Sequence, residues 1–221
     1  MSESFLQDSN ETVELLRRAR SGDRQGLDQL FSRHRERLRR MVDLRLARDL
    51  RDRVDASDVI QEAFLDAARR LDSYLEDRSM PFFLWLRFLT RQSLAALHRH
   101  HLGTKARDPR REVSLCPGPL PGATSEALAA QLLGQGSSPS EAVARSEMQL
   151  RLEEALNRLD PDEREVLALR HFEQLSNAEA ARELEIGEAA ASKRYIRALA
   201  RMKGILAGLK IGIGPRIEPP G

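Results

Sequence analysis

The chain has 221 residues, with 36 Lys and Arg against 34 Asp and Glu, so its net charge is only +2. That length allows one large domain or two small ones. Aromatic residues make up 5% of the chain, and the apolar residues are mostly Leu and Ala, which favour helices over a large β-sandwich or barrel. One cysteine, Cys116, excludes a disulfide framework and a cysteine-based zinc cluster. No apolar run approaches the roughly 18 residues of a membrane span, and the N-terminus is polar and acidic, so we expect an all-α cytoplasmic protein without a signal peptide.

Helical patterns fill residues 10–103, the first predicted domain. A short amphipathic stretch ends near Gly22, and Asp23 is a candidate N-cap for a long helix that reaches Leu46. The pattern resumes at Asp55, and a break at residues 77–79 precedes Pro81, which suits the first turn of a further helix. Apolar residues of the helix after Asp55 recur every three or four positions and are expected to face the core: Val59, Ile60, Ala63, Phe64, Ala67, Ala68 and Leu71.

Composition changes over residues 104–139, where Gly, Pro and Ser gather. A structureless stretch of roughly 36 residues is unusual inside one domain, so we predict a linker between two domains. The alternative is an ordered loop of one larger domain. Residues 128–133 are a candidate short helix within the linker.

Four helices are predicted over residues 140–208, the second domain, and a tail follows at residues 209–221. The second helix starts with Asp160 as N-cap and Pro161 at the first position. Ser176 opens the third helix as part of a capping box. The fourth helix follows a tight turn at residues 186–188 and ends near Leu206. Six of its residues are expected to face the core: Ala190, Ala191, Tyr195, Ala198, Leu199 and Met202.

Positive charge is concentrated in two segments of this nearly neutral chain. Residues 87–111 hold seven Lys and Arg and one acid, and residues 188–206 hold five and one. Two separate basic segments suggest two contacts with a polyanion. The alternative is that both are solvated helix faces.

Residues 176–206 combine a capped helix, a short turn and a basic helix, which is the order of a helix-turn-helix unit. The second helix of such a unit enters the major groove of DNA, where Arg and Lys donors suit phosphate oxygens and the edge of guanine. An ordinary solvated helix of a bundle is the alternative. The side chains predicted to contact DNA are Ser192, Lys193, Arg194, Arg197 and Arg201.

The string LNRLDPDEREVLALRHFEQLSNAEAARELEIGEAAASKRYIRALARMKGIL resembles region 4 of bacterial sigma factors, whose helix-turn-helix reads the −35 promoter element. The resemblance places the five predicted DNA contacts on that recognition surface. Glu185 and Gly187 depart from it, since they stand where the family usually has Gly and Ser in the turn. Gly is an acceptable N-cap, so we expect the turn to form.

Residues 55–75, DASDVIQEAFLDAARRLDSYL, resemble the sigma region 2.2 helix. In the family this helix docks on the clamp helices of the β′ subunit of RNA polymerase. The alternative is that its acidic residues only solvate the helix. The resemblance implies these core-polymerase contacts: Asp55, Asp58, Gln61, Glu62 and Phe64.

Residues 82–108, FFLWLRFLTRQSLAALHRHHLGTKARD, resemble sigma regions 2.3 and 2.4, with Gln92 in place of the usual Asn. The family uses this helix to melt and hold the −10 element, and aromatic and basic side chains suit single-stranded DNA. Trp85 also fits an apolar core stripe with Leu86 and Leu89. The implied −10 contacts are Trp85, Arg91, Gln92 and Arg99.

The two resemblances, in this order and without a region 1.1 or a full domain 3, follow the plan of extracytoplasmic-function (group IV) sigma factors. They imply core RNA polymerase as a partner, through the β′ clamp helices and the β flap, together with promoter DNA. An anti-sigma factor is a further candidate partner, and no membrane contact is expected. The leading alternative is a helix-turn-helix regulator that binds DNA alone, and a structural helical adaptor is a second.

Catalytic and metal sites are not predicted. The sequence has no Gly-rich phosphate loop and no Ser/His/Asp arrangement, so we do not expect an enzyme. His98, His100 and His101 could in principle ligate zinc, but Cys116 is distant and no carboxylate shares their side of a helix. We therefore expect these histidines to belong to a nucleic-acid surface, and we expect no cofactor.

Overall fold

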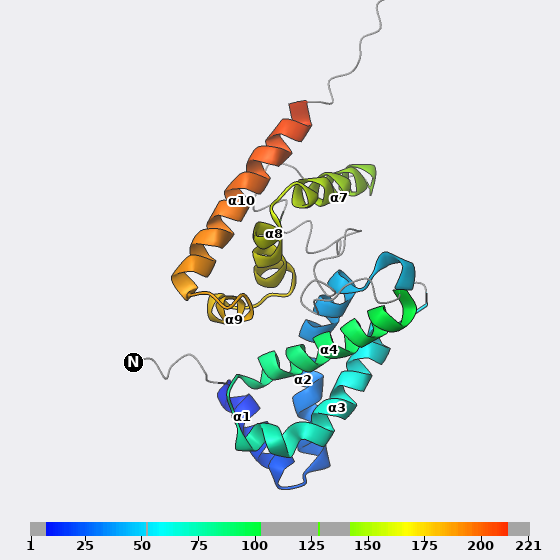
Figure 1. Ribbon diagram of the computed structural model, residues 1–221, viewed down its shortest axis with the longest axis vertical. Coiled ribbons are helices and arrows are strands. Elements are labelled where there is room, and N and C mark those ends of the chain that lie inside the picture. The colour runs from blue at the N-terminus through cyan, green and yellow to red at the C-terminus, as the bar shows by residue number, and fades with distance from the viewer. Residues whose placement is uncertain (1–7, 52, 103–127, 129–141, 212–221) are drawn as a thin grey trace, which may run out of the picture. The chain divides into compact units, whose positions relative to one another are not determined.

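The computed structural model describes residues 8–51, 53–102, 128 and 142–211. The chain forms two compact units, Met1–Cys116 and Pro117–Gly221 (Figure 1). Every regular element in the described ranges is a helix, which confirms the all-α prediction. Among these helices none is long and apolar enough to cross a membrane. The predicted linker lies outside the described residues except for Leu128, which is helical and buried.

In its described residues, the first unit contains four α-helices, α1 to α4, and one short 3-10 helix, η2. The predicted N-cap is confirmed, because the Asp23 Oδ1 atom accepts a hydrogen bond of 3.0 Å from the Gly26 amide. Asp55 caps the third α-helix in the same way, through the Ser57 amide at 2.8 Å. These backbone bonds lower the pKa of both carboxyl groups. The helix bounds are α1 Asn10–Arg20, α2 Arg24–Arg45, η2 Arg48–Leu50, α3 Ala56–Glu76 and α4 Phe82–Leu102.

The aromatic core of the first unit fixes the start of α4. Phe82 is fully buried, and its ring centroid lies 5.6 Å from that of Tyr74 and 5.7 Å from that of Trp85. The Tyr74 hydroxyl donates a 3.0 Å hydrogen bond to the Met80 carbonyl, just before the helix. The Phe82 amide donates to the Asp8 carboxylate at 2.8 Å, so a side chain far away in the sequence caps α4.

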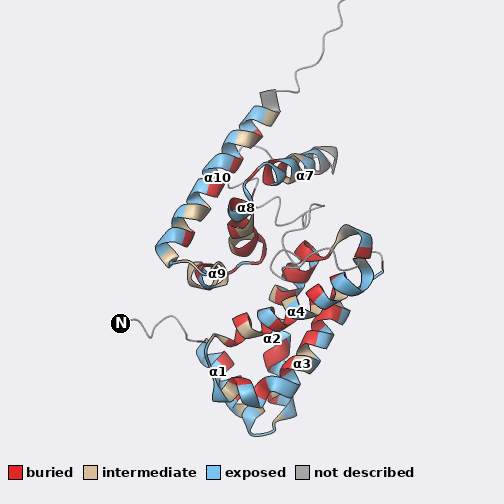
Figure 2. Ribbon diagram, in the orientation of Figure 1, coloured by how far each residue is buried: buried red, intermediate tan, exposed pale blue. Residues whose placement is uncertain are grey.

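The remaining core of the first unit lies between α2, α3 and α4, whose facing sides are buried (Figure 2). Gly26 allows α1 and α2 to approach closely, since a Cβ atom there would lie 2.8 Å from the Cβ atom of Arg18. The predicted core side of α3 is buried apart from Phe64, which is half-buried, and Ala68, which is exposed. The prediction for Ala68 was wrong because this residue follows the buried Ala67 by about 100° around the helix and falls outside the apolar stripe.

The second unit contains the remaining described helices. The capping box is confirmed, because the Glu179 amide donates to the Ser176 hydroxyl at 3.1 Å and the Ser176 amide donates to the Glu179 carboxylate at 2.7 Å. The last helix extends past Leu206, where the sequence pattern placed its end. The bounds are α7 Ala142–Asn157, α8 Pro161–Leu167, the π-helical turn η3 Ala168–Phe172, α9 Asn177–Glu183 and α10 Glu188–Ile211.

The turn between α9 and α10 forms with Glu185 in a left-handed conformation, at φ 55°. The Glu185 amide donates to the Arg182 carbonyl at 3.1 Å, and the Ile186 amide donates to the Ala181 carbonyl at 3.0 Å. This pair of bonds is the Schellman ending of a helix, which usually places Gly at the left-handed position. The departure from the family pattern at Glu185 therefore falls on the residue whose backbone favours Gly.

Two details of the second unit correct the sequence-based expectations. Asp160 stands at the N-cap position of α8, but its side chain makes no capping hydrogen bond; it binds Arg201 instead. Ala190 is exposed on α10, whereas Ala191, Ala198 and Met202 are fully buried. Ala190 and Ala191 differ by about 100° in direction around α10, and only Ala191 lies on the side that packs inside the unit.

Candidate nucleic-acid and polymerase interfaces

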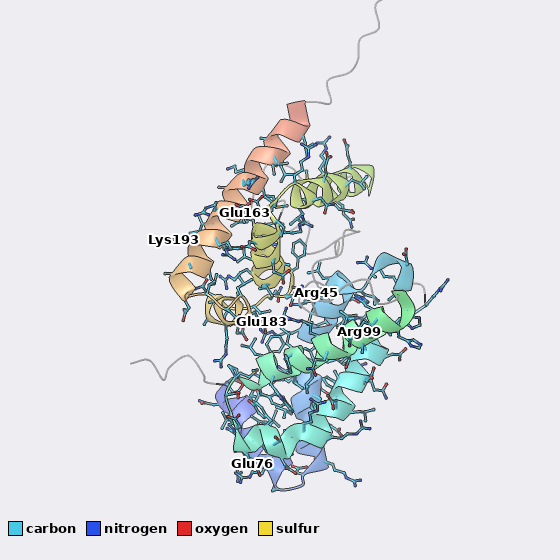
Figure 3. The ribbon with its side chains drawn as sticks, viewed as in Figure 1. Arg45, Glu76, Arg99, Glu163, Glu183 and Lys193 are labelled. Atoms are coloured by element: carbon cyan, nitrogen blue, oxygen red, sulfur yellow. The ribbon has the colours of Figure 1, made fainter. Side chains whose placement is uncertain are left out.

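The outward side of α10 combines two cations with an apolar side chain. Lys193 and Arg197 are exposed, and Ile196 between them is 62% exposed. Residues three and four positions apart share one side of a helix, so these side chains form a single surface. Lys193 lies on the side of α10 away from α8 (Figure 3). The predicted contacts Lys193 and Arg197 thus reach solvent, and Ser192 beside them is half-buried.

The other two predicted contacts on α10 are bound to acidic residues at the start of α8. An Arg194 Nη1 atom lies 3.2 Å from a carboxylate oxygen of Asp162. Arg201 binds both Asp160 and Glu163, with 3.1 Å between its Nη1 atom and Glu163 Oε2. The hydrogen bond and charge of Asp160, followed by the charge of Glu163, raise the pKa of Arg201. These ion pairs tie α10 to α8.

Glu163 is the buried member of this group, with only 9% of its side chain exposed. It lies on the side of α8 that faces α10 (Figure 3). A buried carboxylate requires a partner, and Arg201 supplies one. Helix capping was the predicted role of the acidic residues at the start of α8, so their link to α10 was not predicted. The spacing of Arg194 and Arg201, seven residues apart on one side of a helix, was the signal that could have revealed it.

Contacts between α9 and α10 set the angle of the helix-turn-helix. The Asn177 side-chain amide donates a 3.0 Å hydrogen bond to the Glu188 carbonyl at the start of α10. Ala180 and Ala181 are buried, so their small side chains permit close packing of the two helices. The predicted helix-turn-helix geometry therefore forms, with α10 as its basic second helix.

The candidate −10 surface on α4 has one half-buried end and one exposed end. Trp85 is half-buried and stacks on Tyr74, with 4.4 Å between ring centroids and 21° between ring planes. Arg91 is half-buried, whereas Gln92 and Arg99 are exposed. The structure thus gives Trp85 a packing role in the first unit and leaves Gln92 and Arg99 accessible.

Phe88 belongs to the same side of α4 and was not among the predicted contacts. It is 45% exposed and lies one helical turn before Gln92. The sequence pattern indicated that Phe88 is exposed, because a residue four positions before the polar Gln92 falls outside the apolar stripe of Leu86 and Leu89. An exposed phenyl ring beside an amide is a suitable platform for an unpaired base.

The histidines at the end of α4 have separate environments. His98 is buried, and its Nε2 atom accepts a 3.3 Å hydrogen bond from the Ala47 amide. His100 and His101 are exposed, and their rings lie edge to face with 4.9 Å between the ring centroids. Within the described ranges no group of three or more His, Cys, Asp or Glu residues could hold a metal ion. Cys116 lies outside the described residues.

The candidate polymerase surface on α3 is polar with one apolar residue. Asp58, Gln61 and Glu62 are exposed, and Leu65 beside them is 54% exposed. Asp55 is also exposed, but its carboxylate is engaged in capping the helix, which lowers its pKa. Phe64 packs inside the unit, stacked on Phe31 at 4.5 Å and 7°.

Leu65 was not predicted, although its place three positions after Glu62 and four after Gln61 puts it among them. Leu65 therefore gives this polar surface one exposed apolar side chain. The three surfaces together therefore offer one polar face with an apolar centre and two faces rich in cations.

Comparison with known proteins identifies both units. The chain matches Sigma-70 region 2 over residues 30–101 and Sigma-70, region 4 over residues 149–202. The ECF RNA polymerase sigma factor BldN of Streptomyces coelicolor is 29% identical over 198 residues, which cover 88% of this chain and 67% of that protein. The ECF RNA polymerase sigma factor SigM of Mycobacterium tuberculosis is 28% identical over 204 residues, which cover 92% of this chain and 89% of that protein.

A solved structure shares the fold. The structure of CnrH in complex with the cytosolic domain of CnrY superposes with a TM-score of 0.53 at 22% identity, covering 93% of this chain and 100% of that one. The two family matches lie in the two units, in the order that the sequence predicted. They favour a sigma factor over a regulator that binds DNA alone. The chain therefore belongs to the sigma-70 family, as an extracytoplasmic-function sigma factor that binds core RNA polymerase and promoter DNA in transcription initiation.

Proposed function

We propose that this sigma factor uses three helix faces for three separate contacts. The α10 face reads the −35 element, the α4 face holds the opened −10 element, and the α3 face binds the β′ clamp helices. The observation that carries the proposal is the exposed α10 surface of Lys193 and Arg197 in a helix-turn-helix unit. The factor catalyses no reaction of its own and acts in the cytoplasm with the polymerase. The β flap and an anti-sigma factor stay predicted partners.

At the −35 element, Lys193 and Arg197 donate to base edges and phosphate oxygens of the major groove. Ser192 supports them as a hydroxyl donor near the start of the helix. Arg194 and Arg201 hold α10 against α8, and they reach the phosphates only when the carboxylates of Asp162 and Asp160 release them. This ordering follows from exposure, because the cations of the first pair extend into solvent.

Transcription from a promoter library with a randomised −35 element tests the α10 assignment. Lys193→Ala should change which sequences the holoenzyme uses, since one bidentate base contact contributes roughly 1–3 kcal/mol of discrimination. Arg201→Ala should lower transcription from all dependent promoters without changing their order. If Arg201→Ala changes the preferred sequence and Lys193→Ala does not, the assigned register of α10 is wrong.

At the −10 element, Gln92 and Arg99 face solvent on α4, with the half-buried Arg91 beside them. Single-stranded DNA is bound by cations along its backbone and by flat surfaces against its bases. Replacing Arg91 and Gln92 together by Ala should reduce promoter opening more than initial recruitment. Permanganate reactivity of the −10 thymines measures opening, and unchanged reactivity in the double variant would place the surface elsewhere.

On α3, charge reversal tests the polymerase face. Asp58→Lys together with Glu62→Lys should weaken co-purification with core polymerase and leave the fold intact, because both residues are exposed. Asp28→Lys together with Asp49→Lys is the matched control, with the same charge change on exposed residues of other elements. Equal co-purification of the two double variants would contradict the assignment of α3.

A further inference from the structure

Ile196 is a large apolar side chain on the part of α10 that the second unit does not use for packing. It is 62% exposed, whereas Ala191, Ala198 and Met202 fill the buried side of the same helix. In the described part of the second unit, Leu150 is the other large apolar side chain with such exposure, and it lies on α7. Ile196 therefore does not contribute to holding α10 in place.

The neighbours of Ile196 give this exposed side chain a defined setting. Lys193 lies three positions before it and Arg197 directly after it, and both are exposed. Ala189 and Ala200, which lie seven positions before and four after, are exposed residues with only a methyl side chain. Because residues at these spacings share one side of the helix, the two alanines leave Ile196 more prominent than its neighbours along this line of the helix.

Arg194 and Arg201 strengthen this geometry, because their carboxylate partners on α8 fix which side of α10 faces outward. A helix held in this rotation presents Lys193, Ile196 and Arg197 together. The two cations suit phosphates and the acceptor atoms of guanine. A methyl group has no acceptor atom, so neither cation can recognise it by a hydrogen bond. In the major groove the thymine methyl is the apolar group that distinguishes the bases, and aliphatic side chains contact it.

We propose that Ile196 is a specificity-determining residue that reads a thymine methyl group in the −35 element. The inference rests on the proposed −35 role of α10 and adds the chemistry of one base to it. Contact removes the methyl group and the isoleucine side chain from water, which favours thymine over bases that lack the group.

Replacing thymine by deoxyuridine tests the contact directly, since this change removes the methyl group and keeps base pairing. A promoter is first selected by the holoenzyme from a library with a randomised −35 element. Each −35 thymine, on either strand, is then replaced singly by deoxyuridine, and holoenzyme affinity is measured. At one of these positions the replacement should lower the affinity of the wild-type holoenzyme by about fourfold, which is the effect of burying one methyl group. The Ile196→Ala holoenzyme should bind the two templates equally well.

Two controls separate this contact from other effects. Leu150→Ala removes an equally exposed aliphatic side chain from α7 and should keep the wild-type response to deoxyuridine. Ile196→Val keeps a branched side chain and should retain part of the response. The lost response of Ile196→Ala would then be specific to this position on α10.

Three outcomes would overturn the proposal. No response of the wild type at any thymine, with a −35 sequence still selected, would contradict the methyl contact but leave the proposed function intact. Equal loss of transcription from every −35 sequence in Ile196→Ala, with the deoxyuridine response kept, would indicate a protein contact instead. Failure of the holoenzyme to select any −35 sequence would overturn the proposed function as well.

Discussion

The two helices assigned to promoter DNA, α4 and α10, are held in their units by different forces. The start of α4 is fixed by a buried aromatic cluster around Phe82, with Tyr74 and Trp85, and by the Asp8 cap. The basic helix α10 is fixed by small apolar residues and by the ion pairs of Arg194 and Arg201 with α8. Apolar burial is insensitive to moderate salt, whereas ion pairs near the surface are screened. We therefore expect the attachment of α10, but not that of α4, to weaken as salt increases.

This difference has a functional meaning in the proposed roles. A helix that holds single-stranded bases needs a rigid attachment, made by groups for which the DNA does not compete. The arginines of α10 are bound to carboxylates, so phosphates compete with Asp160 and Asp162 for the same guanidinium groups. Single substitutions can break each attachment separately.

The largest effect is expected for Phe82→Ala. This change empties a fully buried aromatic site and should lower the free energy of unfolding of the first unit by about 3–5 kcal/mol. Urea unfolding followed by Trp85 fluorescence reports on this unit, because Trp85 is the single tryptophan of the chain. Phe88→Ala is the control, since Phe88 is 45% exposed and its loss should leave the unfolding midpoint unchanged. Equal midpoints for the two variants would contradict the aromatic anchor.

Glu163→Gln should weaken the attachment of α10. The change removes the charge that binds Arg201 and should destabilise the second unit by about 1–3 kcal/mol, because the site is buried. Hydrogen exchange of α10 amides, measured at low and high salt, should show faster opening in the variant and a smaller salt effect. Glu154→Gln removes the charge of an exposed ion pair with Arg158 and should have little effect. A salt effect as large in Glu163→Gln as in the wild type would argue against the ion-pair attachment.

Asp8→Ala should cost about 1 kcal/mol, because the Phe82 amide loses its cap. Burial raises the pKa of Asp8 above 3.8, so the folded chain binds this proton more tightly than the unfolded chain. The contribution of Asp8 to stability therefore falls as pH rises from 3.8 through the raised pKa. Asp8→Asn keeps the acceptor oxygen and cannot ionise. The difference in unfolding free energy between wild type and Asp8→Asn should decrease with rising pH, and a difference that is constant with pH would contradict the burial of this carboxyl.

The smallest effect has the opposite sign. Glu185→Gly should stabilise the second unit by up to about 1 kcal/mol, because Gly adopts the left-handed backbone at φ 55° without the steric cost of a Cβ atom. Thermal unfolding of the second unit measures the gain. Glu185→Ala loses the same carboxylate but keeps the Cβ atom, so it should show no gain. Equal effects of the two substitutions would mean that the carboxylate, and not the backbone, sets the cost.

The local elements of the fold were predictable from the sequence because local chemistry sets them. Asp23 and Ser176 each cap a helix through the amide three residues away, and both predictions are confirmed. Apolar periodicity identified the buried side of α3 apart from Phe64, which is half-buried, and Ala68, which is exposed. Alanine is small enough to be tolerated on either side of a helix, so the pattern alone cannot place it.

Contacts between distant residues were not predictable in the same way. The Asp8 carboxylate caps α4 although it lies 74 positions before Phe82 in the sequence. Asp160 stands at a capping position but binds Arg201 instead. A capping residue with a nearby cation has two competing partners, and the three-dimensional packing decides between them. The exposed residues Leu65, Phe88 and Ile196 were not predicted as contacts for another reason: single apolar residues are common on protein surfaces, so the sequence pattern does not distinguish them as contacts.

Run-off transcription with purified core polymerase tests the central claim, that the chain directs promoter-specific initiation through α4 and α10. Genomic fragments serve as templates, and the chain is compared with a variant that carries Gln92→Ala and Lys193→Ala on these two exposed surfaces. We expect discrete transcripts with the wild type, none of them with core polymerase alone, and loss or redirection of those transcripts with the variant. Transcripts that are the same with and without the chain, or the same for wild type and variant, would contradict it.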